Sequence, residues 1–148
     1  MERVKIRLVY PSLEDPNEYE VESVWTKKVG NTFEIDNIPF FAKNIALGDV
    51  VSCEWDDDDM SYYFDELIEV SGNSTVRLLP VSSDYIKEIG ISLEKLGCSW
   101  ESIENGNLIA VNIPRNVDYE IIRNFIIENK LISDYQEACL GHIHPPNA

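Results

Sequence analysis

The sequence predicts an α+β fold in which a β-rich, small barrel-like N-terminal part packs on a C-terminal ferredoxin-like split βαβ part. Two observations predict this fold. Short alternating apolar and polar runs separated by turn residues fill the first half, as in antiparallel strands. The second half instead holds two segments with helical spacing on either side of a hairpin signal. The chain has 148 residues, 44% of them hydrophobic, which suffices for two small units at residues 1–74 and 75–148.

The N-terminal elements are short strands bounded by turns. Pro11 and Pro16 bound the first break, Gly30-Asn31 tolerates the positive φ of a tight hairpin, and Gly48-Asp49 makes a later turn. The strands predicted in the first unit are residues 4–10, 20–29, 32–36, 50–55 and 62–70. Residues 75–81 form the first predicted strand of the second unit. The candidate core residues of the first hairpin are Val21, Trp25, Phe33 and Ile35.

The first predicted helix follows Ser83 as N-cap and stops at Gly97. Gly90 stands inside this helix, where glycine costs about 1 kcal/mol relative to alanine. The apolar residues with helical spacing are Ile86, Ile89, Leu93 and Leu96.

A hairpin and a second helix complete the predicted fold. Asn105-Gly106 is a type I′ turn signal between strands at residues 100–104 and 108–113. Residues 118–130 form an amphipathic helix, and residues 134–140 form a possible last strand. The apolar face of the second helix is expected to hold Ile121, Ile122, Phe125 and Ile126.

The charge balance is strongly acidic. Asp and Glu outnumber Lys and Arg by 27 to 12, for a formal net charge of −15. Phosphate binding depends on Lys and Arg, and Lys43 is the only basic residue between Gly30 and Val76. We therefore expect no nucleic-acid or membrane partner. A basic protein or a metal ion remains as a charged partner, although acidity also serves solubility alone.

The cysteines and the N-terminus indicate the cytoplasm. The charged start from Met1 to Arg7 is not followed by a long apolar run, so signal-peptide and transmembrane patterns are missing. Cys53, Cys98 and Cys139 are an odd, widely spaced set, as expected of reduced thiols. We expect a cytoplasmic protein without a disulfide scaffold.

The run from Cys53 to Glu66 joins four consecutive aspartates to four aromatic residues. Aromatic side chains supply contact area, and carboxylates steer and pair with a cationic partner. We predict a partner-binding surface at a hairpin tip or sheet edge, made of Trp55, Asp56, Asp57, Asp58, Asp59, Tyr63, Asp65 and Glu66. Because side chains alternate along a strand, either Trp55 or Tyr63 should be exposed, with the other aromatics packed.

The aspartates allow two other interpretations. An EF-hand loop starting at Asp56 would need Gly where Ser61 stands and Glu where Leu67 stands. A solvated acidic loop is the default alternative.

The C-terminal sequence Cys-Leu-Gly-His-Ile-His is a weak metal-site candidate. Cys139, His142 and His144 are of the types that bind zinc, but the sequence has no second cluster to complete the coordination. The alternative is a buried Cys139 with both histidines solvated. A Cys–His nucleophile would lack an orienting partner. We predict no cofactor and no catalytic residue; an enzyme would need scattered acids such as Asp49, Glu54 and Asp65.

Four stretches resemble the bacterial domain-of-unknown-function family 4265. They span nearly the whole chain: Val21-Glu22-Ser23-Val24-Trp25, Asp36-Asn37-Ile38-Pro39-Phe40 with Leu47-Gly48-Asp49-Val50-Val51, Ser71-Gly72-Asn73-Ser74-Thr75-Val76-Arg77, and Glu137-Ala138-Cys139-Leu140-Gly141-His142. The resemblance implies a small, soluble bacterial α+β protein with no established activity. Asn73 stands where the family often has histidine, which argues against a general base there. The four aspartates lie outside these motifs.

The predicted function is a non-enzymatic binding protein that neutralises a basic protein partner. A toxin inhibitor fits best, namely an immunity protein against a nuclease-type toxin. Its acidic residues would mimic nucleic acid and pair with Lys or Arg around the toxin's substrate cleft. One alternative is a small metal-binding protein or hydrolytic enzyme that uses the acidic loop or the C-terminal Cys-His cluster. Another is an interaction module with a small-molecule pocket between the two halves.

Overall fold

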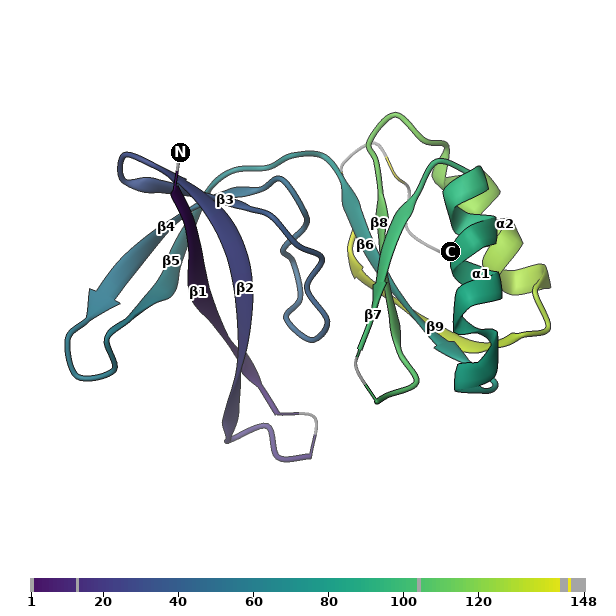
Figure 1. The fold of residues 1–148 in the computed structure, drawn as a ribbon, viewed down its shortest axis with the longest axis horizontal. Helices are drawn as coiled ribbons and strands as arrows, with labels where there is room; N and C mark the ends of the chain where they lie inside the picture. Colours follow the sequence, from purple (N-terminus) through teal and green to yellow (C-terminus); the bar gives the residue numbers. More distant parts are fainter. Residues whose placement is uncertain (1, 13, 104, 142–143, 145–148) are drawn as a thin grey trace.

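The computed structural model describes residues 2–12, 14–103, 105–141 and 144, which form a mixed α+β fold with two sheets and two α-helices. A barrel lies at one end of the molecule, both helices lie at the other, and the second sheet stands between them (Figure 1). The first unit contains β1 (Glu2–Pro11), β2 (Tyr19–Val29), β3 (Thr32–Ile35), β4 (Val50–Asp56) and β5 (Ser61–Glu69). The second contains β6 (Ser74–Pro80), the 3₁₀ turn η1 (Ser83–Tyr85), α1 (Ile86–Lys95), β7 (Ser99–Ser102), β8 (Ile109–Ile113), α2 (Tyr119–Glu128) and β9 (Ile132–Cys139).

The five N-terminal strands close into a barrel in the order β1-β2-β3-β4-β5. Neighbouring strands pair antiparallel, and the barrel closes through a parallel contact of β1 with β5, in which Ile6 pairs with Tyr62. An up-and-down path through an odd number of strands requires this parallel closure. The barrel core contains Ile6, Leu8, Val24, Phe33, Ile35, Ala42, Ile45 and Val51.

The inward face of β2 differs from the predicted one. Phe33 and Ile35 are buried as expected, but Val21 is 49% exposed. Trp25 lies on the outer face, half-buried beneath the side chains of Arg3 and Lys5. The inward positions of β2 are Glu22, Val24 and Thr26, so the prediction for Val21 and Trp25 was wrong by one residue. A shift of one residue inverts every side chain of a strand, and two of the inward residues are polar.

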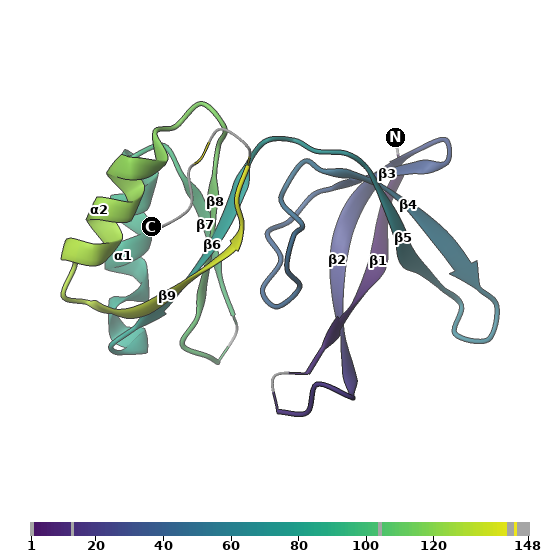
Figure 2. The same ribbon diagram turned by 180° about the vertical axis from the view of Figure 1, so that it is seen from behind.

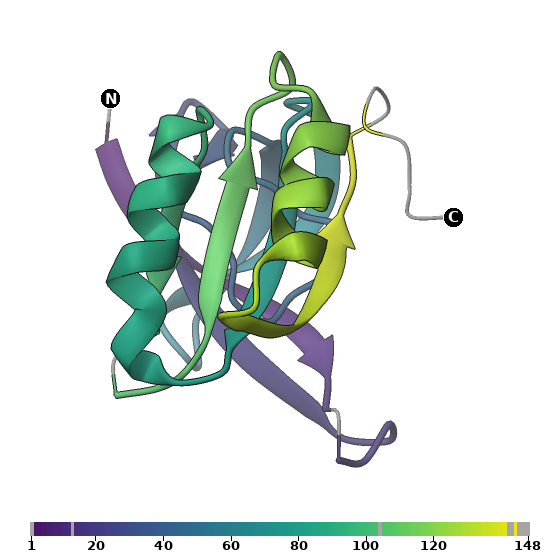
Figure 3. The same cartoon turned by 90° about the vertical axis from the view of Figure 1, so that its right-hand side faces the viewer.

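The second sheet is antiparallel, with strand order β7-β8-β6-β9. Both helices cover one of its faces, and the barrel lies behind the other (Figure 3). The buried core between helices and sheet contains Val76, Leu78, Ile89, Leu93, Cys98, Ile109, Val111, Ile113, Tyr119, Ile122 and Ile126. Neither helix of the described residues has the long apolar run needed to cross a bilayer.

Local signals place the helices with small corrections. Ser82, not Ser83, accepts the capping hydrogen bond, from the Asp84 N–H. Gly97 ends α1 with φ +95°, as predicted. On α2, Ile121 is 53% exposed, so its placement on the apolar face was wrong, because the core side of this helix is centred on Ile122 and Ile126.

The β7–β8 turn is longer than the predicted two-residue type I′ turn. The Gly106 N–H donates to the Ile103 carbonyl, and the positive φ belongs to Asn105. The turn is therefore centred one residue earlier, and the regular strands end at Ser102 and begin again at Ile109.

Residues 36–49, which we call the β3–β4 loop, lie between the barrel and the second sheet (Figure 2). The Asn44 N–H donates to the Ala138 carbonyl of β9 at 3.0 Å. The Thr75 hydroxyl of β6 donates to the Ile45 carbonyl at 3.2 Å. The loop thus joins the two units through its backbone.

Candidate functional site

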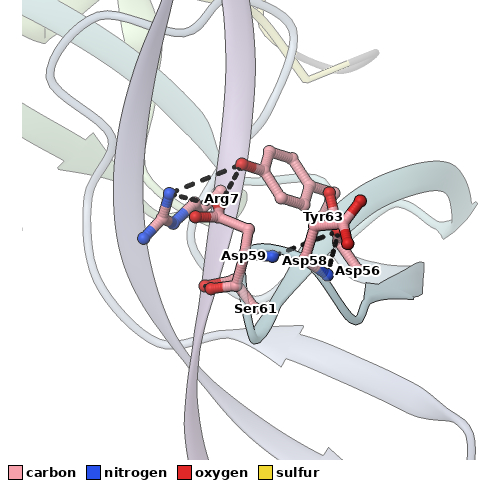
Figure 4. Close-up of polar contacts among 6 residues, drawn as sticks. All are labelled: Arg7, Asp56, Asp58, Asp59, Ser61 and Tyr63. Atoms are coloured by element: carbon pink, nitrogen blue, oxygen red, sulfur yellow. Dashed lines mark hydrogen bonds and ion pairs between the residues drawn. The ribbon is translucent and has the colours of Figure 1, made fainter.

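The four aspartates form the tip of the β4–β5 hairpin, where Asp56 pairs with Ser61. One oxygen of the Asp56 carboxylate accepts the backbone N–H groups of Asp58 and Asp59, at 2.9 and 3.2 Å (Figure 4). Met60 follows with φ 53°, which closes the turn. Aspartate side chains commonly order turns in this way. The tip is therefore a structured turn that a carboxylate organises from within.

Arg7 of β1 braces this tip. Its Nη1 atom lies 2.6 Å from Oδ2 of Asp59, and the Tyr63 hydroxyl donates to the same carboxylate oxygen (Figure 4). The hydrogen bond to Asp59 raises the pKa of the Tyr63 phenol. Asp59 is thus partly neutralised inside the molecule, and Tyr63 takes part in the brace.

The aromatic residues of the hairpin divide between the barrel and the solvent. Tyr62 and Phe64 pack against the barrel core, and the Tyr62 ring lies 4.9 Å from the Trp55 ring in an edge-on contact. Trp55 is 48% exposed, and its indole N–H donates to Asp57 at 2.7 Å. Trp55 is therefore the exposed aromatic residue at the tip, and its orientation is fixed by Tyr62 on one side and Asp57 on the other.

Asp65 and Glu66 lie away from the tip. Both are exposed on β5, and the Glu66 N–H donates to the Ser52 hydroxyl on β4. At about 3.3 Å per residue, Glu66 stands roughly 17 Å along the strand from Ser61. The eight predicted contact residues therefore extend along one hairpin and do not gather at one point.

His144 of the C-terminal Cys-His cluster is held by hydrogen bonds inside the fold. His144 is 3% exposed; Nδ1 lies 2.5 Å from the Ser74 hydroxyl, and Nε2 lies 3.0 Å from the Val117 carbonyl. A carbonyl accepts only, so Nε2 donates to it. The expectation that His144 is solvated was wrong, because Ser74 on β6 and Val117 hold its ring inside the fold. His142 lies outside the described residues.

The other residues of the predicted metal and enzyme sites make structural contacts or lie apart from one another. Burial raises the pKa of the Cys139 thiol to about 11, which opposes a thiolate ligand or nucleophile. The Asp49 carboxylate accepts the N–H groups of Ala46 and Ser71, at 3.0 and 2.9 Å. In the part of the chain that the structure describes, no three His, Cys, Asp or Glu side chains gather as a metal site.

A groove lies between the two units, where one alternative drawn from the sequence placed a small-molecule pocket, although no sequence motif marks the residues that line it. It encloses about 770 Å³ between the β1–β2 hairpin, the β3–β4 loop and the open face of the second sheet. The Tyr10 and Phe41 rings stack within it, 6.0 Å apart and 17° from parallel. Burial and the neighbouring Glu20 carboxylate raise the pKa of Tyr10 to about 12.

Two buried charges of opposite sign hold the loop segment behind this groove. The Glu22 carboxylate accepts the N–H groups of Phe40, Phe41 and Ala42, at 2.5, 3.0 and 3.0 Å. From β6, Arg77 donates to the carbonyls of Phe41 and Ala42. Burial lowers the pKa of the Arg77 guanidinium, and the nearby Glu22 charge opposes this. Glu22 thus binds the backbone N–H groups of this segment, and Arg77 binds its carbonyl groups.

A family model described as a domain of unknown function (DUF4265) matches residues 22–133. The chain belongs to this family. The family resemblance drawn from the sequence motifs is thereby confirmed. The DUF4265 chain is also similar to a solved structure described as a novel crystal structure of a hypothetical protein from Neisseria gonorrhoeae. The two are 31% identical over 95% of this chain and 97% of that chain, with a TM-score of 0.75. No curated protein matches the chain.

In this DUF4265 chain, the motif residues converge on the β3–β4 loop. Asn37 accepts the Trp25 N–H at 2.5 Å, and the Asn73 side chain donates to the Leu47 carbonyl at 2.9 Å. Glu22, Asp49 and Arg77 bind the same loop, as described above. Glu22 and Arg77 are charged residues inside predicted strands, which is a sequence signal for such a role. The tertiary structure decides that both face the loop.

Proposed function

We propose that this protein is a non-enzymatic, cytoplasmic binding protein that docks its acidic β4–β5 hairpin on a basic protein. The relationship that fits best is that of an immunity protein to a nuclease-type toxin. The observation that carries the proposal is the internal order of the hairpin tip. Asp56 caps two backbone N–H groups, and Arg7 fixes Asp59. A loop ordered in advance loses little conformational entropy when it binds.

Charge supports the same role. The β4–β5 hairpin has no Lys or Arg from Val50 to Val70, whereas Asp57 and Asp58 are exposed at its tip. A surface of one sign raises the rate at which an oppositely charged partner associates. Asp57 also orients Trp55, which supplies apolar contact area next to the charge. This combination suits a basic cleft that normally holds a nucleic-acid backbone.

The experiment compares association rates for two variants that remove the same charge. The partner is the basic protein that this chain retains from a lysate of its source organism. Asp57→Asn/Asp58→Asn should slow association severalfold at low salt and flatten its salt dependence. Glu88→Gln/Glu94→Gln, at exposed positions on α1, should leave both properties unchanged. Equal rates for the two variants would overturn the role of the hairpin.

The immunity function has its own test. The recovered partner should show nuclease activity that this protein abolishes at equimolar amounts. A partner without nuclease activity would leave the hairpin as a docking surface but would reject the toxin relationship. Elemental analysis of the purified protein tests the alternative, a metal-binding or hydrolytic role.

We also propose that the second unit is a ferredoxin-like split βαβ module on which the barrel packs. The strand order β7-β8-β6-β9 and the helices α1 and α2 on one face support this assignment. The backbone contacts of the β3–β4 loop with β6 and β9 support the packing.

A further inference from the structure

We propose that the groove between the barrel and the second sheet binds a small monocarboxylate with a flat apolar body. This inference does not depend on the acidic tip of the β4–β5 hairpin, although Phe64 of β5 lines the groove. The groove volume of about 770 Å³ is within the range of small-molecule sites. Its walls come from both units, so the site exists only when the barrel and the sheet are together.

Arg77 supplies the anion-binding group. It is 5% exposed and lines the groove. Nη1 donates to the Phe41 carbonyl and to the Gln136 side chain, and Nη2 donates to the Ala42 carbonyl. A guanidinium has five N–H groups, so these contacts use three. Among the described residues, Nε has no hydrogen-bond partner.

Arg77 offers the groove a positive charge that lacks a carboxylate partner among the residues described, whereas its Nε atom is enclosed by the protein. In the described part of the chain, no carboxylate forms an ion pair with Arg77. The nearby Glu22 carboxylate is already committed to three backbone N–H groups. A buried charge without a direct partner is costly, so a bound carboxylate would complete the site.

The rest of the groove selects the body and the charge of the ligand. The Tyr10–Phe41 stack offers flat aromatic surface, and Leu79 on β6 is 43% exposed beside it. The exposed charged residues of the lining are Glu14, Glu20, Asp134 and Lys43. The three carboxylates outnumber the one ammonium group and disfavour a ligand with several negative charges. A single carboxylate on an apolar body complements the Arg77 charge and the aromatic wall together.

The test uses 3-phenylpropionate and its uncharged amide, 3-phenylpropionamide, as matched probes. At millimolar concentration, the acid should shift the NMR signals of the Arg77 Nε–H and of the backbone N–H groups from Phe41 to Asn44. The amide should bind at least severalfold more weakly, because its attraction to the Arg77 charge is lost. Equal affinity for the acid and the amide, or no shifts with the acid, would overturn the proposal.

Two tryptophan variants locate the binding site without disturbing the buried Arg77. Leu79→Trp places a large side chain in the groove from an exposed position and should abolish the shifts. Ile127→Trp, at a position 59% exposed on α2, should leave them unchanged. Shifts that persist in Leu79→Trp would place the bound acid elsewhere and reject the groove.

Discussion

Gly90 of α1 lies directly against the indole ring of Trp100 in β7. A Cβ atom at position 90 would stand 2.6 Å from Nε1 of Trp100 and closer still to Cε2 and Cζ2. An interior glycine weakens a helix by local propensity, yet here it allows the helix to approach the sheet. The absence of a side chain at Gly90 is what makes room for the largest side chain of β7.

Gly90→Ala should therefore destabilise the protein, although alanine is the better helix former. The propensity gain is about 1 kcal/mol, whereas overpacking a filled site typically costs about 1–3 kcal/mol. We expect the free energy of unfolding to fall, as measured by chemical denaturation. Glu94→Ala, at an exposed position on the same helix, should change it by less than about 0.5 kcal/mol.

A double-mutant cycle isolates the cause of that loss. Trp100→Leu removes the ring that a Cβ at position 90 would meet, so Gly90→Ala should cost little in this background. A stabilising effect of Gly90→Ala in the wild-type background would contradict the packing described here.

Glu22→Gln should be strongly destabilising. Gln has one acceptor oxygen in place of two, so it cannot satisfy the N–H groups of Phe40, Phe41 and Ala42 as Glu22 does. Arg77 would also lose a nearby opposite charge. Unsatisfied buried groups cost about 1–3 kcal/mol each, and an uncompensated buried charge costs more.

Chemical denaturation measures the effect of Glu22→Gln, and the N–H signals of Phe40, Phe41 and Ala42 locate it by NMR. The control is Glu18→Gln, which removes an equal charge at an exposed position near β2. Equal stability of the two variants would show that the carboxylate of Glu22 does not hold the β3–β4 loop.

The three thiols should react slowly at neutral pH. Burial raises the pKa of Cys53 to about 12, and those of Cys98 and Cys139 to about 11, from an ordinary value of 9.0. Two pKa units reduce the thiolate fraction, and with it the alkylation rate, by about a hundredfold. Alkylation by iodoacetamide at pH 8, followed by mass spectrometry, should therefore be at least this much slower than for free cysteine.

The same shifts set the sign of the pH dependence of stability. Above pH 9 the thiols of the unfolded chain lose protons that the thiols of the folded protein keep. The contribution of the protonated thiols to the free energy of unfolding is therefore complete below pH 9 and is lost as pH rises through 11. The denaturation midpoint should therefore fall from pH 8 to pH 10.

Rapid alkylation of Cys139 at pH 8 would contradict the slow reaction expected of the thiols. It would indicate a reactive thiolate and restore the metal or nucleophile interpretation.

Local patterns in the sequence were sufficient to place the secondary structure. The Gly97 stop, the alternating runs of the barrel and the apolar spacing of Ile89 and Leu93 depend on neighbours along the chain, and the structure agrees with each of them. The four-aspartate run likewise falls at a hairpin tip, since it separates two strand-forming runs. The motifs also identified the family.

The candidate sites depended on contacts that the sequence does not reveal. Glu22 is buried because the β3–β4 loop folds back upon β2, and His144 is buried because Ser74, 70 positions earlier, meets its ring. Asp59 is braced by Arg7 only because the barrel closes β5 on β1.

The sequence by itself therefore determined the order of the elements, the family and the overall acidity of this protein. Only the tertiary structure decided which faces point inward, which aspartates remain free at the hairpin tip, and where the groove forms. The physical reason is the separation along the chain of the residues that interact. Helix caps, turns and periodicity act over a few residues, whereas the grip of Glu22 and Arg77 on Phe41 joins residues 19 and 36 positions apart.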